Sequence, residues 1–475
     1  MKGQACIGRE GDRQASAACI GRPLQPTPYH ACPMSRPTPS TREHMPIQIG
    51  LPAEPAWAVA EPAPISYLAF VTGDELPDPG AAFTAAGESF GLAPQNVEPV
   101  PIEDDRVAWA FSFSLPNRGA RAMLWCEHAI EGASPDGKAS DARWVIFIET
   151  LLEQSRAVDD AIALAATVAR AGAARTRLVF DPSLGVAWGR AEIDELLLGT
   201  GMHAPGELID ERHLYRVELV ARDRTNGPYW IATVGLARAG LPELELLEVP
   251  VAHVRAGLEL VDALAARLLA RDGSTAGLEL PHAGVPFEAG PGLRVALVPA
   301  LEAAETLAPG VPGDAGDRRG LPPGPRAAIC AAGKRGAFRQ VWVSPIEELA
   351  CLSRNEAGLY LAPRVSLVRE RVARRTWSAF RDAFHRHATA TVAAAGASDA
   401  AFLAKIARGD AEGTREHVWI TVEHAEANGG RGILVRAGAE PERVAFSLDQ
   451  LGDWRIVGLR AELPEVGPES ARLLA

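Results

Sequence analysis

Short hydrophobic runs alternate with amphipathic stretches along the first half of the chain. Alternating apolar and polar positions, rich in aromatic residues, predict strands, and a continuous apolar run such as WVIFIET predicts a buried one. These strand patterns cover residues 65–72, 107–114, 120–128, 144–150 and 176–181. Residues 157–173 place apolar side chains on one helical face. Because this helix lies between two strand patterns, we expect a local parallel crossover.

The middle of the chain repeats this alternation. We expect a short helix at 190–199 and a long helix at 254–271. The intervening strand patterns predict a meander built from residues 213–223, 229–236 and 243–249. Further strands are expected at 290–299, 326–331 and 340–345, and a helix at 346–354. Pro and Gly dominate 308–325, which predicts a flexible loop.

The pattern changes near residue 363. Residues 364–386 carry apolar side chains at helical spacing, and their arginines are expected on the solvated face. Strand patterns follow at 401–408, 416–424, 431–437 and 443–449, with a hairpin turn at 426–430. We therefore expect an α+β protein. It has a larger mixed-sheet domain at 45–362 and a small domain at 363–475, built from one helix on an antiparallel sheet.

The first 44 residues differ from the rest. ACIGR occurs at 5–9 and again at 18–22, among Pro, Ser, Gln and Arg without apolar periodicity. A segment that buries so little does not offset its ordering entropy, so we expect a disordered tail. Because ordered patterns follow Met45, we hypothesise that the protein starts there.

The C-terminal part resembles a known bacterial family. The stretches TWSAF (376–380), FLAKI (402–406), EHVWI (416–420) and FSLDQLGDW (446–454) are similar to those of the YegJ-like domains, which have no established activity. We take the polar and aromatic residues of these stretches as candidate binding residues: Glu416, His417, Trp419, Asp453 and Trp454. The alternative for His417 is a local hydrogen bond at the start of a strand.

The region before it resembles a second bacterial domain of unknown function, often found ahead of the YegJ-like one. YWIATVGLARAGLPELELL (229–247) and GVPFEAGPGL (284–293) carry this resemblance. The resemblance implies histidines at the positions of Ala232 and Val234. Any metal or acid–base role of such histidines is therefore not expected here.

Charge and the motifs that we searched for argue against several classes of function. The formal net charge of -12 argues against nucleic acid as a partner, because phosphate contacts need a basic surface. We expect no membrane span, because no apolar run approaches 18 residues. We find no nucleotide-binding, serine-hydrolase or zinc-protease motif, and expect neither a metal nor a cofactor. The isolated cysteines fit buried thiols in a cytoplasmic protein.

One pair of carboxylates is a candidate active site. Glu243 and Glu245 share one side of a predicted strand, and two close carboxylates can serve as acid and base in a dry pocket. Arg238 and Thr233 would orient a substrate, and Trp230 would offer a stacking platform. The alternative is a strand with Leu244 and Leu246 in the core and its glutamates in water, with Trp230 in the core or at its rim.

These observations favour a cytoplasmic, non-enzymatic protein that acts through contacts with a protein partner. An immunity or stress-accessory protein is one version of this hypothesis, because an acidic face can cover a basic partner. The alternative is a hydrolase that uses Glu243 and Glu245.

Overall fold

The computed structural model describes two compact units, here called the large unit (Ser40–Val368) and the C-terminal unit (Arg369–Ala475). The residues that the structure describes are 47–48, 62–115, 118–130, 135–137, 139–199, 204–223, 225, 227–270, 278–305, 307–314, 316–318, 324–332, 341–354, 357–393, 400–408, 416–435, 440–460 and 463–468. The expected tail at 1–44 lies outside them. Helices and open sheets occur together, so the α+β prediction is confirmed.

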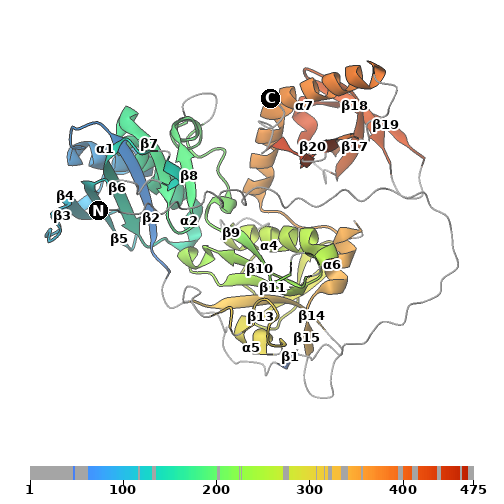
Figure 1. The fold of residues 1–475 in the computed structure, drawn as a ribbon, viewed down its shortest axis with the longest axis horizontal. Coiled ribbons are helices and arrows are strands. Elements are labelled where there is room, and N and C mark those ends of the chain that lie inside the picture. Colours follow the sequence, from blue (N-terminus) through green and yellow to red (C-terminus); the bar gives the residue numbers. More distant parts are fainter. Residues whose placement is uncertain are drawn as a thin grey trace, which may run out of the picture. The chain divides into compact units, whose positions relative to one another are not determined.

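The large unit contains a seven-stranded antiparallel sheet in the order β3-β4-β5-β6-β2-β7-β8 (Figure 1). Its strands are β2 (Ile65–Thr72), β3 (Gln95–Pro99), β4 (Val107–Ser114), β5 (Arg121–His128), β6 (Ala142–Thr150), β7 (Thr176–Asp181) and β8 (Val186–Gly189). The strands β6 and β7 both pair with β2 in the antiparallel sense, so they run parallel to each other with β2 between them. The expected crossover is therefore present, but its two strands are not neighbours.

Two helices cover one face of this sheet. Helix α1 (Pro79–Phe90) packs beside α2 (Ala157–Ala171), and α2 lies against β2, β6 and β7. Many positions of α2 are alanine, which lets the helix approach the strands closely. One apolar cluster joins the helices to the sheet, and Phe83 of α1 meets Phe111 and Phe113 of β4 edge to face.

The second half of the large unit is an eight-stranded mixed sheet. The order is β1-β15-β14-β11-β10-β9, with β13 also paired to β14 and β12 to β13. Its strands are β1 (Ile47–Gln48), β9 (Arg216–Ala221), β10 (Tyr229–Val234), β11 (Glu243–Val249), β12 (Phe287–Gly290), β13 (Leu293–Pro299), β14 (Arg326–Ala332) and β15 (Val341–Val343). The β9–β10–β11 meander is as expected, whereas β11 and β14 are parallel.

Helix α4 (Val254–Leu269) packs on β10 and β11 through one close approach. A Cβ atom on Gly257 would lie 2.7 Å from Cδ1 of Ile231, so only glycine fits there without rearrangement. The helices α5 (Ala300–Glu305) and α6 (Ile346–Ser353) complete this half. The short helix expected at 190–199 is instead one turn of α-helix, α3 (Arg190–Glu192), followed by a π-helical turn at Ile193–Leu197.

The C-terminal unit packs most of one long helix, α7 (Pro363–Ala393), on an antiparallel sheet, as the sequence predicts, but the sheet has six strands where four were expected. The sheet order is β19-β18-β17-β16-β20-β21. Its strands are β16 (Ala401–Arg408), β17 (Glu416–Glu426), β18 (Gly429–Leu434), β19 (Glu442–Ser447), β20 (Leu451–Arg460) and β21 (Leu463–Val466). Trp377 and Phe380 of the helix stack at 4.6 Å inside its core.

Candidate functional site: an apolar row on the seven-stranded sheet

Glu243, the first candidate residue, is engaged by donors from its own hairpin. Its carboxylate accepts hydrogen bonds from Thr233 Oγ1 at 2.7 Å and from the backbone N–H groups of Gly235 and Ala237 at 2.8 and 3.1 Å. Thr233 in turn accepts a bond from the Leu244 amide. Glu243 is 7% exposed, so its carboxylate closes the turn between β10 and β11.

Glu245 points to different partners. It is fully buried and forms ion pairs with Arg318, and with Arg326 at 3.0 Å. Arg318 belongs to the Pro- and Gly-rich segment expected to be a flexible loop, and its side chain is only 7% exposed. The guanidinium also lies 5.5 Å from the ring centre of Trp230, which is itself in the core.

The expectation that the two glutamates lie in water is therefore wrong, because both faces of β11 are covered. Arg238, expected to orient a substrate, is also buried. It forms an ion pair with Asp181 at 2.6 Å and donates a hydrogen bond to the Leu214 carbonyl at 2.6 Å. Glu243, Glu245 and Arg238 thus hold three separate sets of internal contacts.

The candidates in the C-terminal unit divide between two faces of its sheet. Trp454 is in the core, where its indole N–H donates to Thr376 Oγ1 at 3.1 Å. Asp453 lies across the β16–β20 ladder from Lys405, and Lys405 lies across the β16–β17 ladder from Trp419. Burial lowers the pKa of Lys405 and raises that of Asp453. The side chains of Glu416 and His417 lie outside the described residues.

The seven-stranded sheet contains a feature that our sequence reasoning missed. On the face opposite α1 and α2, register places six apolar residues side by side across six strands. We call this set the apolar row: Ala110, Trp125, Phe147, Leu68, Phe180 and Ala187. Every member is only partly buried. The outer face of an antiparallel sheet normally carries polar residues, so an apolar row there indicates a surface for contact.

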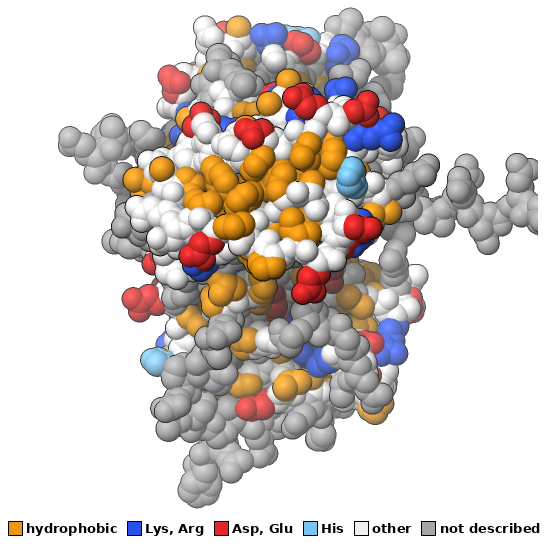
Figure 2. Space-filling view, turned by 90° about the vertical axis from the view of Figure 1, so that its left-hand side faces the viewer, with side chains coloured by type: hydrophobic (Ala, Val, Ile, Leu, Met, Phe, Trp, Pro, Cys, Tyr) orange, Lys and Arg blue, Asp and Glu red, His pale blue; other side chains and the backbone are white. Residues whose placement is uncertain are grey.

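Figure 2, which looks at the side where Figure 1 draws this sheet, shows hydrophobic side chains gathered in one broad patch with charged side chains around it. Within the apolar row, the Trp125 and Phe147 rings stack at 4.8 Å with an angle of 4° between their planes. Such a pair presents a rigid aromatic surface at low cost in side-chain entropy. Met123, two residues before Trp125, is 40% exposed beside the row.

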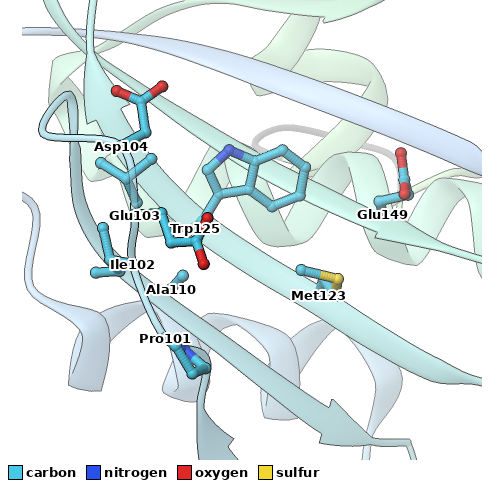
Figure 3. A pocket seen from close by; sticks show the side chains of 9 residues that line it. Pro101, Ile102, Glu103, Asp104, Ala110, Met123, Trp125 and Glu149 are labelled. Carbon is cyan, nitrogen blue, oxygen red and sulfur yellow. The ribbon is translucent and has the colours of Figure 1, made fainter.

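A pocket of about 350 Å³ adjoins Trp125 (Figure 3). We call it the Trp125 pocket; its lining is Pro101, Ile102, Glu103, Asp104, Val107, Ala110, Met123, Trp125 and Glu149. In Figure 3 the loop at 101–104 forms one side, and Met123 and Glu149 lie on the other. The cross-strand neighbours of Trp125 are Phe147 on β6 and Ala110 on β4. Because Ala110 has only a methyl group, space remains beside the indole on that side.

Carboxylates dominate the charge around this pocket. Glu103, Asp104 and Glu149 line it, and Glu127 lies two residues after Trp125. Burial raises the pKa of Glu127, while Arg106 and a side-chain hydrogen bond with Trp125 oppose this shift. Arg106 pairs with Asp104 at 2.5 Å. The site therefore joins an aromatic surface to an acidic border.

Other reactive groups of the described chain are buried or dispersed. Burial raises the pKa of Cys126 and of Cys330 to about 12, so both remain thiols at neutral pH. Glu211 is 3% exposed, and burial raises its pKa to about 7. Among the described residues, no group of three or more His, Cys, Asp or Glu residues could hold a metal ion. Within the same ranges, none of the helices is both long and apolar enough to cross a membrane.

The comparisons identify one domain in this chain. Residues 217–329 match the family model described as a protein of unknown function (DUF4026), C-terminal. The matched range begins in β9 and ends in β14, so it covers the centre of the eight-stranded sheet and both buried glutamates. Neither a curated protein nor a solved structure gives a significant match.

Proposed function

We propose that this protein is a non-enzymatic binding protein and that the apolar row is the centre of its contact surface. The apolar row carries this proposal: six partly exposed apolar residues lie in register on the sheet face opposite the helices. Protein interfaces concentrate their binding free energy in aromatic residues at the centre of such a surface. The stacked Trp125 and Phe147 fit that role. An immunity or stress-accessory role would be one form of this binding.

The buried carboxylates support a structural role rather than the hydrolase alternative. General acid–base catalysis needs a carboxyl group within hydrogen-bonding reach of a substrate. Both oxygens of Glu243 and of Glu245 already accept hydrogen bonds from internal donors. We therefore assign these glutamates to the stability of the eight-stranded sheet.

Two finer assignments rest on sequence and are part of the proposal. We propose that the C-terminal unit is a YegJ-like domain, because the stretches that carry this resemblance form its helix and strands. We also propose a cytoplasmic location, in line with the free thiols of Cys126, Cys330 and Cys351.

The proposed function can be tested by comparing partner capture by three forms of the tagged full-length chain, expressed in its own host. Trp125→Ser removes the aromatic centre of the apolar row. Leu301→Ser is the matched control, because Leu301 is 69% exposed on α5 in the same unit. We expect a stoichiometric protein that the wild type and Leu301→Ser retain and that Trp125→Ser loses. Identical sets of captured proteins from all three forms would contradict the proposal.

A further inference from the structure

The border of the Trp125 pocket has an unbalanced charge. Four carboxylates, those of Glu103, Asp104, Glu127 and Glu149, line the pocket or flank Trp125, and Asp105 follows in the same loop. Arg106, the cation next to this loop, is paired with Asp104 through two side-chain nitrogens, and Arg121, two residues before Met123, is paired with Glu98 at 2.9 Å. The border is therefore negative, and it attracts groups of opposite charge.

An indole beside carboxylates suits a particular kind of group. The face of a tryptophan ring attracts cations, and guanidinium groups also stack on it. The carboxylates of Glu103 on the loop and Glu149 on β6 line the same pocket from different elements, so a cation in the pocket would have negative charge on two sides. The pocket volume of about 350 Å³ lies at the small end of ligand sites, which fits one long side chain.

We propose that the partner presents a basic segment, which lays apolar side chains on the apolar row and inserts a lysine or arginine side chain into the Trp125 pocket. This inference rests on the proposed function and specifies the chemistry of the partner. The apolar row binds the hydrophobic side chains of the segment, whereas Glu103 and Glu149 select its charge. An acidic or neutral segment could make the apolar contact with the row but would not match the charge of the pocket.

A display library of random 12-residue peptides tests the selection of charge. The library is selected on the full-length wild type, and each binder is then measured against the wild type and Trp125→Ser. We expect the binders that need Trp125 to be enriched in Lys and Arg together with Leu, Phe or Trp. Enrichment in Asp and Glu, or no charge bias, would overturn the inference while leaving the apolar row as a binding surface. An absence of binders that need Trp125 would instead reject the proposed function itself.

Charge variants of the pocket give a second readout. Glu103→Gln and Glu149→Gln should each weaken a selected basic peptide on the order of two- to fivefold at low salt, and added salt should reduce that difference. Glu88→Gln is the matched control, because Glu88 is 62% exposed on α1, which packs on the other face. Equal weakening by all three substitutions would overturn the role of the pocket.

Folding and self-association are checked in the same preparations. Met123→Ser provides a second variant of the pocket in case Trp125→Ser does not fold, since Met123 is already 40% exposed. Light scattering measures the mass in solution. A dimer that Met123→Ser dissociates would show that the row binds a second copy of this chain, and would overturn the basic partner.

Discussion

Glu245 offers the sharpest test of the structure, because one neutralising substitution leaves two cations without their counter-charge. In Glu245→Gln, the buried guanidinium groups of Arg318 and Arg326 would face an uncharged amide. Their side chains are 7% and 9% exposed, so water cannot replace the lost carboxylate. Breaking a buried ion pair by removing one partner costs about 3–5 kcal/mol of unfolding free energy.

The corresponding change in melting temperature follows from the size of the large unit. Unfolding entropy is roughly 2.1 cal/mol/K per residue, which gives about 0.7 kcal/mol/K for the about 330 residues of this unit. The expected decrease in melting temperature is therefore about 4–7 °C. Differential scanning calorimetry of the full-length chain measures it directly.

Glu259→Gln is the matched control for charge. Glu259 is 51% exposed on α4 and pairs with Arg255 at 3.1 Å, an exposed pair that contributes about 0.5 kcal/mol or less. Its melting temperature should change by less than about 1 °C. If Glu245→Gln and Glu259→Gln had the same melting temperature, the assignment of Glu245 to stability would be refuted, and a functional role for Glu245 would regain support.

Three further substitutions probe other parts of the structure. Burial raises the pKa of Glu211 to about 7, so the folded protein binds this proton more tightly than the unfolded chain does. The folded state therefore becomes less stable as pH rises from about 4.5 to 7. Glu211→Gln should therefore stabilise the protein at pH 8 by about 3 kcal/mol and leave it unchanged at pH 4; equal effects at both pH values in chemical denaturation would contradict this. Phe380→Ala should lower the unfolding free energy of the C-terminal unit by about 3–5 kcal/mol, because Phe380 is buried in its core. The control Val435→Ala, at a 67% exposed position, should change it little; equal unfolding midpoints for the two variants would contradict the described packing. Gly257→Ala should change the stability by less than about 1 kcal/mol, because the contact of the new methyl group with the movable Cδ1 end of Ile231 opposes the roughly 1 kcal/mol that alanine gains over glycine inside a helix; a loss above about 2 kcal/mol would show that Ile231 cannot shift.

Hydrophobic periodicity predicted most of the elements because burial imposes it. Residues 416–424 alternate, and they form β17 across from β16 and β18. Helix α7 begins at Pro363, one residue before the expected start. By contrast, the edge strand β3 is exposed at every position, so no apolar pattern marks it. The helix expected at 190–199 is present over 190–197, but its second part is π-helical, because helical periodicity does not distinguish an α-helix from a π-helical turn.

The candidate site was harder to predict for a physical reason. The Glu–Leu alternation of β11 is typical of a strand with one face in water, yet here the polar face is covered by Arg318, which lies 73 residues further along the chain. Only a tertiary contact reveals such a partner. For the apolar row, a local signal existed: Trp125 and Phe147 occupy the outer positions of two expected strands. What the sequence does not show is the register that places them against each other.

The Arg318–Glu245–Arg326 contact also constrains how this chain can diverge. A related chain that loses Glu245 keeps two buried cations without their counter-charge. A related chain that loses one of the two arginines leaves the buried carboxylate with only one ion pair. The three residues should therefore be inherited together or be replaced together by apolar residues, although they lie in three separate segments of the sequence. Their co-variation, rather than the persistence of any one of them, is the mark that this contact should leave among related chains.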